Sequence, residues 1–104
     1  MMNQKEFNEY ANILLKDFDV VLFDEEGEAG NFKKGDEKKL TDYVFDVEMS
    51  AVVLYSKGGV RVGQLDLNMD RSEEKGVYVE ISNHSDNPVT NEVASRADRY
   101  YPKH

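Results

Sequence analysis

Residues 43–69, YVFDVEMSAVVLYSKGGVRVGQLDLNM, decide the fold, because they predict a long β-hairpin. From Tyr43 to Tyr55 every second residue is apolar, which is typical of one face of a strand. Gly58-Gly59 predicts a two-residue turn, since glycine adopts without strain the positive φ that both central positions require. A second strand then runs back from Val60. The predicted apolar face of the first strand consists of Tyr43, Phe45, Val47, Met49, Ala51, Val53 and Tyr55.

The second strand of this hairpin carries one inserted residue. Its apolar positions change phase at Gly63-Gln64, between Val62 and Leu65, as they do at a β-bulge. Pairing across the turn with this insertion brings the apolar residues of both strands to one face. The predicted apolar pairs are Tyr55 with Val62, Val53 with Leu65, Ala51 with Leu67 and Met49 with Met69. The predicted pairs on the opposite face are Glu48 with Asp70, Ser50 with Asn68 and Val52 with Asp66.

The flanking segments predict two helices and two further strands. Asn3 and Glu6 form a capping-box pattern at the start of an amphipathic helix over residues 4–18. Residues 20–23, VVLF, predict a short strand, and residues 77–83 predict a third strand of a meander. Asn87-Pro88 predicts the start of a last helix. Its apolar stripe is Val89, Val93, Ala97 and Tyr100 or Tyr101.

The predicted fold class is therefore α+β. We expect an antiparallel β-meander of three to four strands with a bulged long hairpin, and N-terminal and C-terminal helices on one sheet face. The length of 104 residues predicts a single domain over residues 1–104. Residues 24–40 are rich in glycine and charge and predict a mobile acidic loop. A loop of this length in a small domain is either disordered or functional.

Composition excludes several classes of protein. The absence of cysteine removes disulfide scaffolds, thiolate zinc sites and cysteine nucleophiles. No apolar run approaches the ~20 residues that span a bilayer, and the N-terminus lacks a signal-peptide pattern, so we expect a cytoplasmic protein. A net charge of −8 disfavours binding to nucleic acid or to anionic membranes and favours a basic protein partner.

The predicted register gathers acidic side chains on the exposed sheet face. Pairing of Met69 with Val77 would also place Glu80 beside Asp66. Alternate residues on a strand are about 6.7 Å apart, similar to successive phosphates of a nucleic acid strand, which suggests nucleic acid mimicry. The alternative is a solubilising face whose repulsion is screened over about 8 Å at physiological salt. The partner-binding residues predicted on the sheet are Asp46, Glu48, Asp66, Asp70 and Glu80, and those predicted on the loop are Asp24, Glu25, Glu26 and Glu28.

Catalytic and metal chemistry is not predicted. Ser82, His84, Ser85 and Asp86 include the residue types of a catalytic triad. Neighbours at one strand end do not converge as a triad requires, and a turn whose side chains bond the backbone is the expected structure. The second histidine is His104 at the terminus. The D-x-N-x-D pattern at residues 66–70 lacks the glycine and glutamate of a calcium loop. We therefore expect no enzyme, no cofactor and no metal site.

Residues 77–87, VYVEISNHSDN, resemble strand-end segments of small phage and mobile-element proteins. The group that this segment most resembles is the anti-CRISPR inhibitors of type II effector nucleases. The resemblance implies a small intracellular phage-type protein that acts by binding, and it assigns no binding residues. We therefore expect an inhibitor that binds an RNA-guided effector nuclease, or its guide complex, through an acidic surface and blocks nucleic acid binding or cleavage. The alternative is an immunity or antitoxin-type protein that neutralises a basic toxin.

Overall fold

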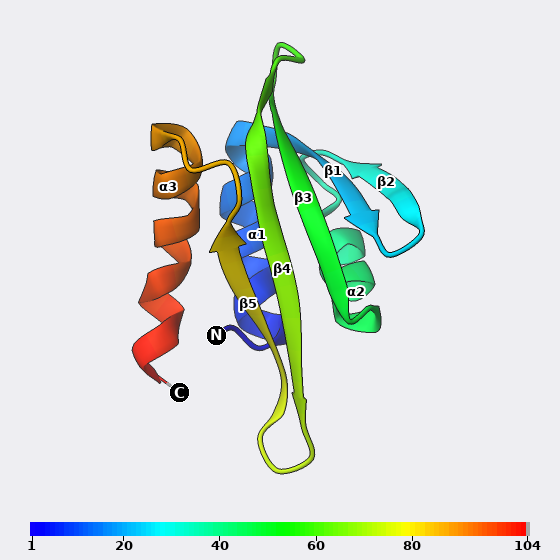
Figure 1. The fold of residues 1–104 in the computed structure, drawn as a ribbon, viewed down its shortest axis with the longest axis vertical. Coiled ribbons are helices and arrows are strands. Elements are labelled where there is room, and N and C mark those ends of the chain that lie inside the picture. The colour runs from blue at the N-terminus through cyan, green and yellow to red at the C-terminus, as the bar shows by residue number, and fades with distance from the viewer. Residues whose placement is uncertain (104) are drawn as a thin grey trace.

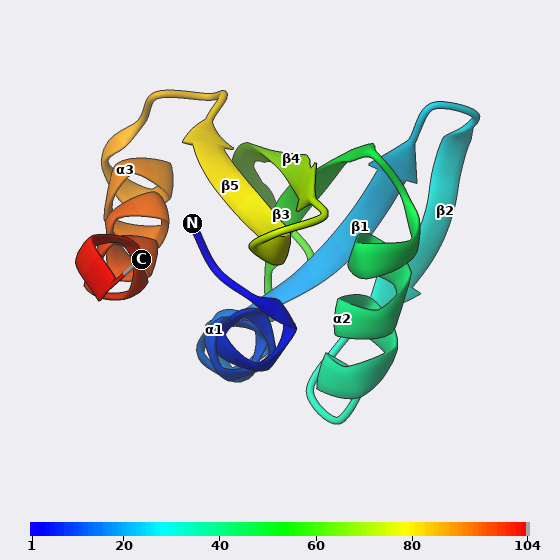
Figure 2. The ribbon, with the colours of Figure 1, turned by 90° about the horizontal axis from the view of Figure 1, so that it is seen from below.

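The computed structural model describes the backbone of residues 1–103 and the side chains of residues 1–100. Within these residues the fold is α+β, with an open sheet of five antiparallel strands in the order β2-β1-β3-β4-β5. The helices lie on one face of the sheet (Figures 1 and 2). The predicted class and meander are confirmed, although the sheet has one strand more than predicted. In chain order the elements are α1 (Gln4–Asp17), β1 (Phe18–Asp24), β2 (Gly27–Phe32), α2 (Glu37–Asp46), β3 (Met49–Ser56), β4 (Arg61–Ser72), β5 (Gly76–Asn83), α3 (Pro88–Ser95) and the 3-10 helix η1 (Arg96–Lys103).

Helix α1 begins and ends much as the sequence predicts. The Asn3 side chain accepts a hydrogen bond from the Glu6 amide at 2.8 Å, and the Glu6 carboxylate accepts one from the Asn3 amide at 3.0 Å. This capping box satisfies amide groups that the first helical turn leaves unpaired. The Tyr10 hydroxyl donates to the carbonyl of Val93 at 2.7 Å, which joins α1 to α3. The buried face of α1 is Phe7, Tyr10, Ala11, Leu14 and Leu15.

The β3–β4 hairpin has a three-residue loop in place of the predicted two-residue turn. The Ser56 amide donates to the Val60 carbonyl at 2.8 Å, so Lys57-Gly58-Gly59 forms the loop. The predicted bulge is present, but it lies one position earlier. Tyr55 pairs with Arg61 and Leu54 pairs with Gly63, so Val62 is the extra residue.

This single extra loop residue moves every side chain of β3 to the opposite face from the one predicted. Val52 and Leu54 are buried in the core, and Val52 pairs with Leu65. The predicted pairs of Glu48 with Asp70, Ser50 with Asn68 and Val52 with Asp66 are therefore wrong. The reason is that residues 52–54, Val-Val-Leu, are apolar on both faces, so alternation alone does not choose between the two registers.

The first strand of the hairpin begins at Met49, and the prediction that it begins at Tyr43 is wrong. Residues 37–46 form helix α2. Alternation at Tyr43, Phe45 and Val47 is also compatible with a helix, because Leu40, Thr41, Val44 and Phe45 recur at helical spacing and form its buried face.

The irregular loop expected over residues 24–40 is replaced by strand β2 and the start of α2. The sequence of β2, GEAGNF, contains few residues that favour strands, so its structure comes from pairing with β1 and from burial of Phe32. Gly27 has a φ of 120°, which glycine tolerates at the tight turn between the two strands.

The C-terminal part of the chain follows the prediction, except that Val89, predicted in the apolar stripe of the last helix, is 43% exposed. Strand β5 directs Val79 and Ile81 inward, and Asn87 caps α3 with Pro88 at its first turn. Met69 pairs with Val79 and not with Val77 as predicted. Because this shift is two residues, the faces of β5 are unchanged. The side chains of Tyr101 and His104 lie outside the described residues.

Candidate protein-binding surface on the open sheet face

One face of the sheet is free of described helices (Figures 1 and 2). Its centre, along β1 and β3, is apolar, because the residues that alternate with the core residues of these strands are also apolar, apart from Asp19 at the start of β1. Val53 is only 5% exposed although it lies on this open face, whereas Met49 is 57% exposed. The apolar centre, as we define it, consists of Val21, Phe23, Met49, Ala51, Val53 and Tyr55.

Polar and acidic residues flank the apolar centre on both sides. Strand β2 contributes Glu28 and Asn31, which pair with Phe23 and Val21. On the other side, the outward residues of β4 and β5 are Arg61, Gln64, Asp66, Asn68, Asp70, Ser72, Tyr78, Glu80 and Ser82, of which only Arg61, opposite Tyr55, is basic. An apolar centre with a polar rim is the usual composition of a protein interface.

Asp66 is held in place by two neighbours. The Gln64 side-chain amide donates to one carboxylate oxygen at 2.9 Å, and His84 Nδ1 lies 2.9 Å from the other. The predicted turn is confirmed, since Ser85 Oγ accepts from the Gln64 amide and Asn83 Oδ1 accepts from the Asp86 amide. His84, however, does more than end the strand, because it orients an acidic side chain of the open face.

The acidic residues predicted on the sheet are only partly brought together. Asp66, Asp70 and Glu80 lie on the open face, as predicted. Asp66 pairs with Ala51 and Ser82, Asp70 with Tyr78, and Glu80 with Asn68, so none of these three acids stands directly opposite another. The prediction that Glu80 lies beside Asp66 as its direct partner is wrong. This arrangement avoids the repulsion that like charges directly across a ladder would cause.

Asp46 and Glu48 do not lie on a strand, which corrects their predicted position on the sheet. Asp46 is the last residue of α2, and Glu48 lies in the connection to β3. The Glu48 carbonyl accepts from the Met69 amide at 3.1 Å. Arg71 fixes the same connection, because its guanidinium donates to the carbonyls of Phe45 and Val47 at 3.0 Å each.

The four acidic residues predicted on the loop have different environments. The Asp24 carboxylate accepts from the Tyr43 hydroxyl and from the Glu26 amide, so it anchors the turn, and it remains partly exposed beside the hollow at Met49. The hydrogen bond from Tyr43 lowers the pKa of Asp24 below its ordinary value, and the same bond raises the pKa of Tyr43. Glu25 and Glu26 are exposed in the turn, and Glu28 is exposed on β2.

Nearly all of the net negative charge comes from the strands and their connections. Within residues 1–103 the helices, η1 included, hold seven basic and eight acidic residues. The strands and connecting segments hold six basic and thirteen acidic residues. The helices are therefore almost neutral, and the strands with their connecting segments carry a net charge of −7.

A hollow of about 420 Å³ lies at one end of the apolar centre, between Phe23, Met49, Ala51, Asp66 and Asn68. Of these residues only Asp66 was predicted as a site residue, because the predicted register turned Met49 and Ala51 into the core. A loop of three residues in place of two would have predicted Met49 and Ala51 on the open face, so the hairpin loop length is the signal that could have found them.

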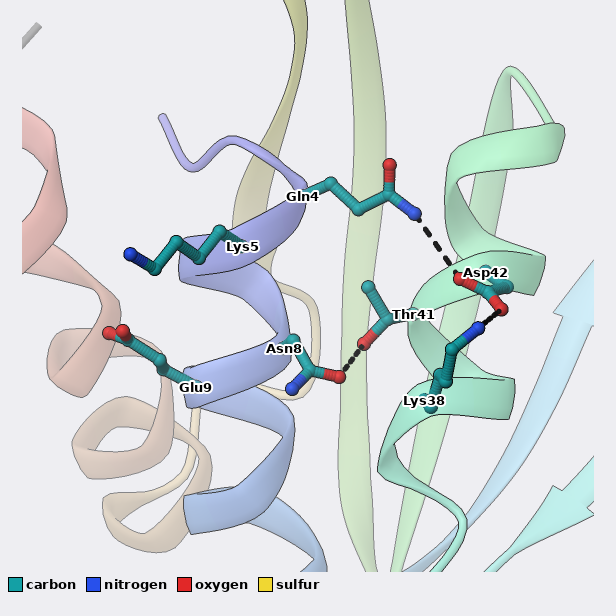
Figure 3. A pocket seen from close by; sticks show the side chains of 7 residues that line it. All are labelled: Gln4, Lys5, Asn8, Glu9, Lys38, Thr41 and Asp42. Atoms are coloured by element: carbon teal, nitrogen blue, oxygen red, sulfur yellow. Dashed lines mark hydrogen bonds and ion pairs between the residues drawn. The ribbon is translucent and has the colours of Figure 1, made fainter.

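A second groove lies between α1 and α2 (Figure 3). Its polar groups bond one another: Gln4 donates to Asp42 at 3.2 Å, and Thr41 donates to Asn8 at 3.1 Å. Lys38 forms an ion pair with Asp42 at 2.7 Å. These bonds join the two helices, so we assign this groove to helix packing.

No family model, curated protein or solved structure matches this chain. Within the described part of the chain, no helix is long and apolar enough to cross a membrane. The same residues contain no group of three or more His, Cys, Asp or Glu side chains placed to hold a metal ion.

Proposed function

We propose that the protein is an inhibitor that acts by binding, and that it docks its open sheet face on a basic, nucleic-acid-binding surface of a partner protein. The observation that carries this proposal is the apolar centre of the open face with acidic residues around it, namely Glu28, Asp66, Asp70 and Glu80. Complementary charge speeds association and selects the partner, while the apolar centre supplies buried area.

The partner that we propose is an RNA-guided effector nuclease of type II, acting in the cytoplasm of a phage host. Such effectors hold guide and target in positively charged channels, which an acidic protein can occupy. The resemblance of residues 77–87 to anti-CRISPR inhibitors supports this choice of partner. In this mechanism the bound protein blocks access of nucleic acid, or the movement needed for cleavage, and performs no chemistry itself.

The contact does not depend on imitation of a duplex. Asp66 and Asp70 are four residues apart on β4, which corresponds to about 13 Å and exceeds the spacing of successive phosphates. The proposed contact is instead an ordinary protein interface with an acidic rim. The proposed contact residues are therefore Asp66, Asp70, Glu80 and Glu28 of the rim, with Glu25 and Glu26 beside it and Glu48 at its end.

The test compares two double variants of equal charge change. Asp70→Lys with Glu80→Lys reverses the charge of two residues on the open face. Glu9→Lys with Asp98→Lys makes the same change of charge in the helical layer. All four side chains are exposed. DNA cleavage by a purified type II effector is measured with each protein. Loss of inhibition in the first variant alone supports the proposal, and equal inhibition by both variants removes the open face from the mechanism.

The alternative is neutralisation of a basic toxin by the same face. The effector assay separates the two functions, because an antitoxin would leave cleavage unchanged at every concentration tested. Protection of cells from a co-expressed basic toxin, lost again in the open-face variant, would then identify the protein as an antitoxin.

A further inference from the structure

The end of the open face around Met49 has the features of a pocket for a single side chain. Met49 is 57% exposed and separates two adjoining hollows. Both hollows are lined by Glu25, Met49 and Asn68, so they adjoin each other on the two sides of Met49. We call the two hollows together the Met49 pocket.

The local fold explains how these side chains meet. Met49 is the first residue of β3 and pairs with Asn68 on β4, so both side chains point to the open face. Glu25 comes from the β1–β2 turn. That turn is held by Asp24, which accepts from the Glu26 amide at 2.8 Å and also from the Tyr43 hydroxyl of α2.

The Met49 pocket combines an apolar floor with free carboxylates. Phe23, Ala51 and Asp66 line one hollow, and Glu48, Met69 and Arg71 line the other. The Arg71 guanidinium donates to the carbonyls of Phe45 and Val47. Within the described residues, the carboxylates of Glu25 and Glu48 have neither a side-chain hydrogen bond nor an ion pair. An unpaired carboxylate beside exposed apolar atoms is complementary to a cation on an apolar stem.

Arginine fits this combination better than lysine. Its planar guanidinium packs on flat apolar surfaces such as a phenylalanine ring, and it presents several donors at once to carboxylate and amide oxygens. Lysine carries a more strongly hydrated ammonium group, and interfaces are enriched in arginine and depleted of lysine.

We propose that the Met49 pocket binds an arginine side chain, with its stem on Met49 and Phe23 and its guanidinium at Glu25, Asn68 and Glu48. This proposal rests on the proposed function in one respect: the arginine belongs to the basic surface of the protein partner. The pocket itself can be tested without that partner.

The test uses the whole protein and a short peptide, acetyl-Gly-Arg-Gly-amide, in a two-dimensional NMR titration of the backbone amides. Two matched peptides replace arginine with lysine or with citrulline, which keeps the shape of arginine but has no charge. We expect the arginine peptide to shift the amides near residues 25, 49 and 68. The lysine peptide should bind more weakly, and the citrulline peptide should give no saturable shift.

Variants then locate the binding. Glu25→Gln should weaken binding of the arginine peptide about two- to fivefold, the range that one exposed ion pair supports. Glu9→Gln is the matched control, because Glu9 is also acidic and exposed but lies on helix α1 and does not line the pocket. Equal weakening by both variants, equal binding of the lysine peptide, or shifts centred on Glu73-Glu74 would overturn the proposal.

The outcome for the pocket is separate from the outcome for the function. Binding of the arginine peptide without inhibition of any effector would keep the pocket and reject the partner. Inhibition that depends on Asp70 and Glu80, without localised arginine binding, would keep the proposed function and reject the pocket.

Discussion

Gly63 on β4 lies so close to Thr90 on α3 that a Cβ atom at residue 63 would meet the Thr90 Cγ2 atom at 2.5 Å. This contact follows from the bulge, because the carbonyl of the extra residue, Val62, accepts a hydrogen bond from the Asn87 side chain at 3.0 Å. Asn87 is also the N-cap of α3. The irregular point of β4 is therefore the place where the C-terminal helix docks.

Gly63→Ala should destabilise the protein by about 1–3 kcal/mol, because the added methyl group overlaps a buried helix residue. The free energy of unfolding is measured by urea denaturation. The matched control is Gly58→Ala, where a Cβ would meet only the Ser56 hydroxyl at 3.8 Å, and it should change stability by less than about 0.5 kcal/mol. Equal stability of the two variants would show that α3 moves away from β4 without cost.

The bond between Tyr43 and Asp24 predicts a pH-dependent contribution to stability. The folded-state pKa of Asp24 is lowered by this bond, so the stabilisation is present above the ordinary pKa of 3.8 and is lost as the pH falls through the folded-state pKa. Tyr43→Phe should therefore be less stable than the wild type at neutral pH, and the difference should shrink in acid.

Urea denaturation of both proteins across this pH range checks the prediction. Tyr55→Phe is the control, because the Tyr55 hydroxyl makes no hydrogen bond within the described residues, and its effect should not vary with pH in the same range. A Tyr43→Phe effect that stays constant down to the lowest pH would contradict the assignment.

Lys57 in the hairpin loop stabilises the end of α1. Its ammonium group donates to the Leu15 carbonyl at 2.9 Å and forms an ion pair with Asp19 at 2.9 Å. Lys57→Met keeps the apolar stem but removes a cation at a helix C-terminus, and it should cost about 0.5–2 kcal/mol. Amide hydrogen exchange should quicken in the last turn of α1. Arg61→Met, which removes an exposed cation on the other side of the loop, should leave that exchange unchanged.

His84→Ala should have little effect on stability, below about 1 kcal/mol, because the contact with Asp66 is solvent-exposed. It should instead change the open face by freeing one oxygen of Asp66. Association with a basic partner is then expected to be at least as fast as for the wild type, as measured by stopped-flow or surface plasmon resonance. Ser82→Ala is the control, and a marked slowing by His84→Ala alone would show that the histidine itself contacts the partner.

Local signals in the sequence predicted the elements that are specified locally. The capping residues Asn3 and Asn87 placed the starts of α1 and α3, and the alternation of Leu65, Leu67, Val79 and Ile81 gave the core face of β4 and β5 correctly. These features need no knowledge of distant partners.

The failures concern features that depend on tertiary contacts. Strand β2 has little intrinsic preference for a strand and is specified by β1, while the face of β3 depends on one loop residue. The candidate site shares this dependence. Charge together with the correctly predicted faces of β4 and β5 identified Asp66, Asp70 and Glu80, whereas the wrong face predicted for β3 concealed Met49 as a surface residue.

The position of β3 between β1 and β4 has a consequence for how this chain tolerates insertions and deletions. A strand paired along both edges cannot turn over without breaking two ladders, so a change in the length of residues 57–59 has to be absorbed elsewhere. The nearest position where the β3–β4 pairing already shifts register is the bulge residue Val62, next to the point where α3 packs on β4. Homologues in which the loop at residues 57–59 is shorter or longer should therefore carry compensating changes near the bulge at Val62, and not in β3.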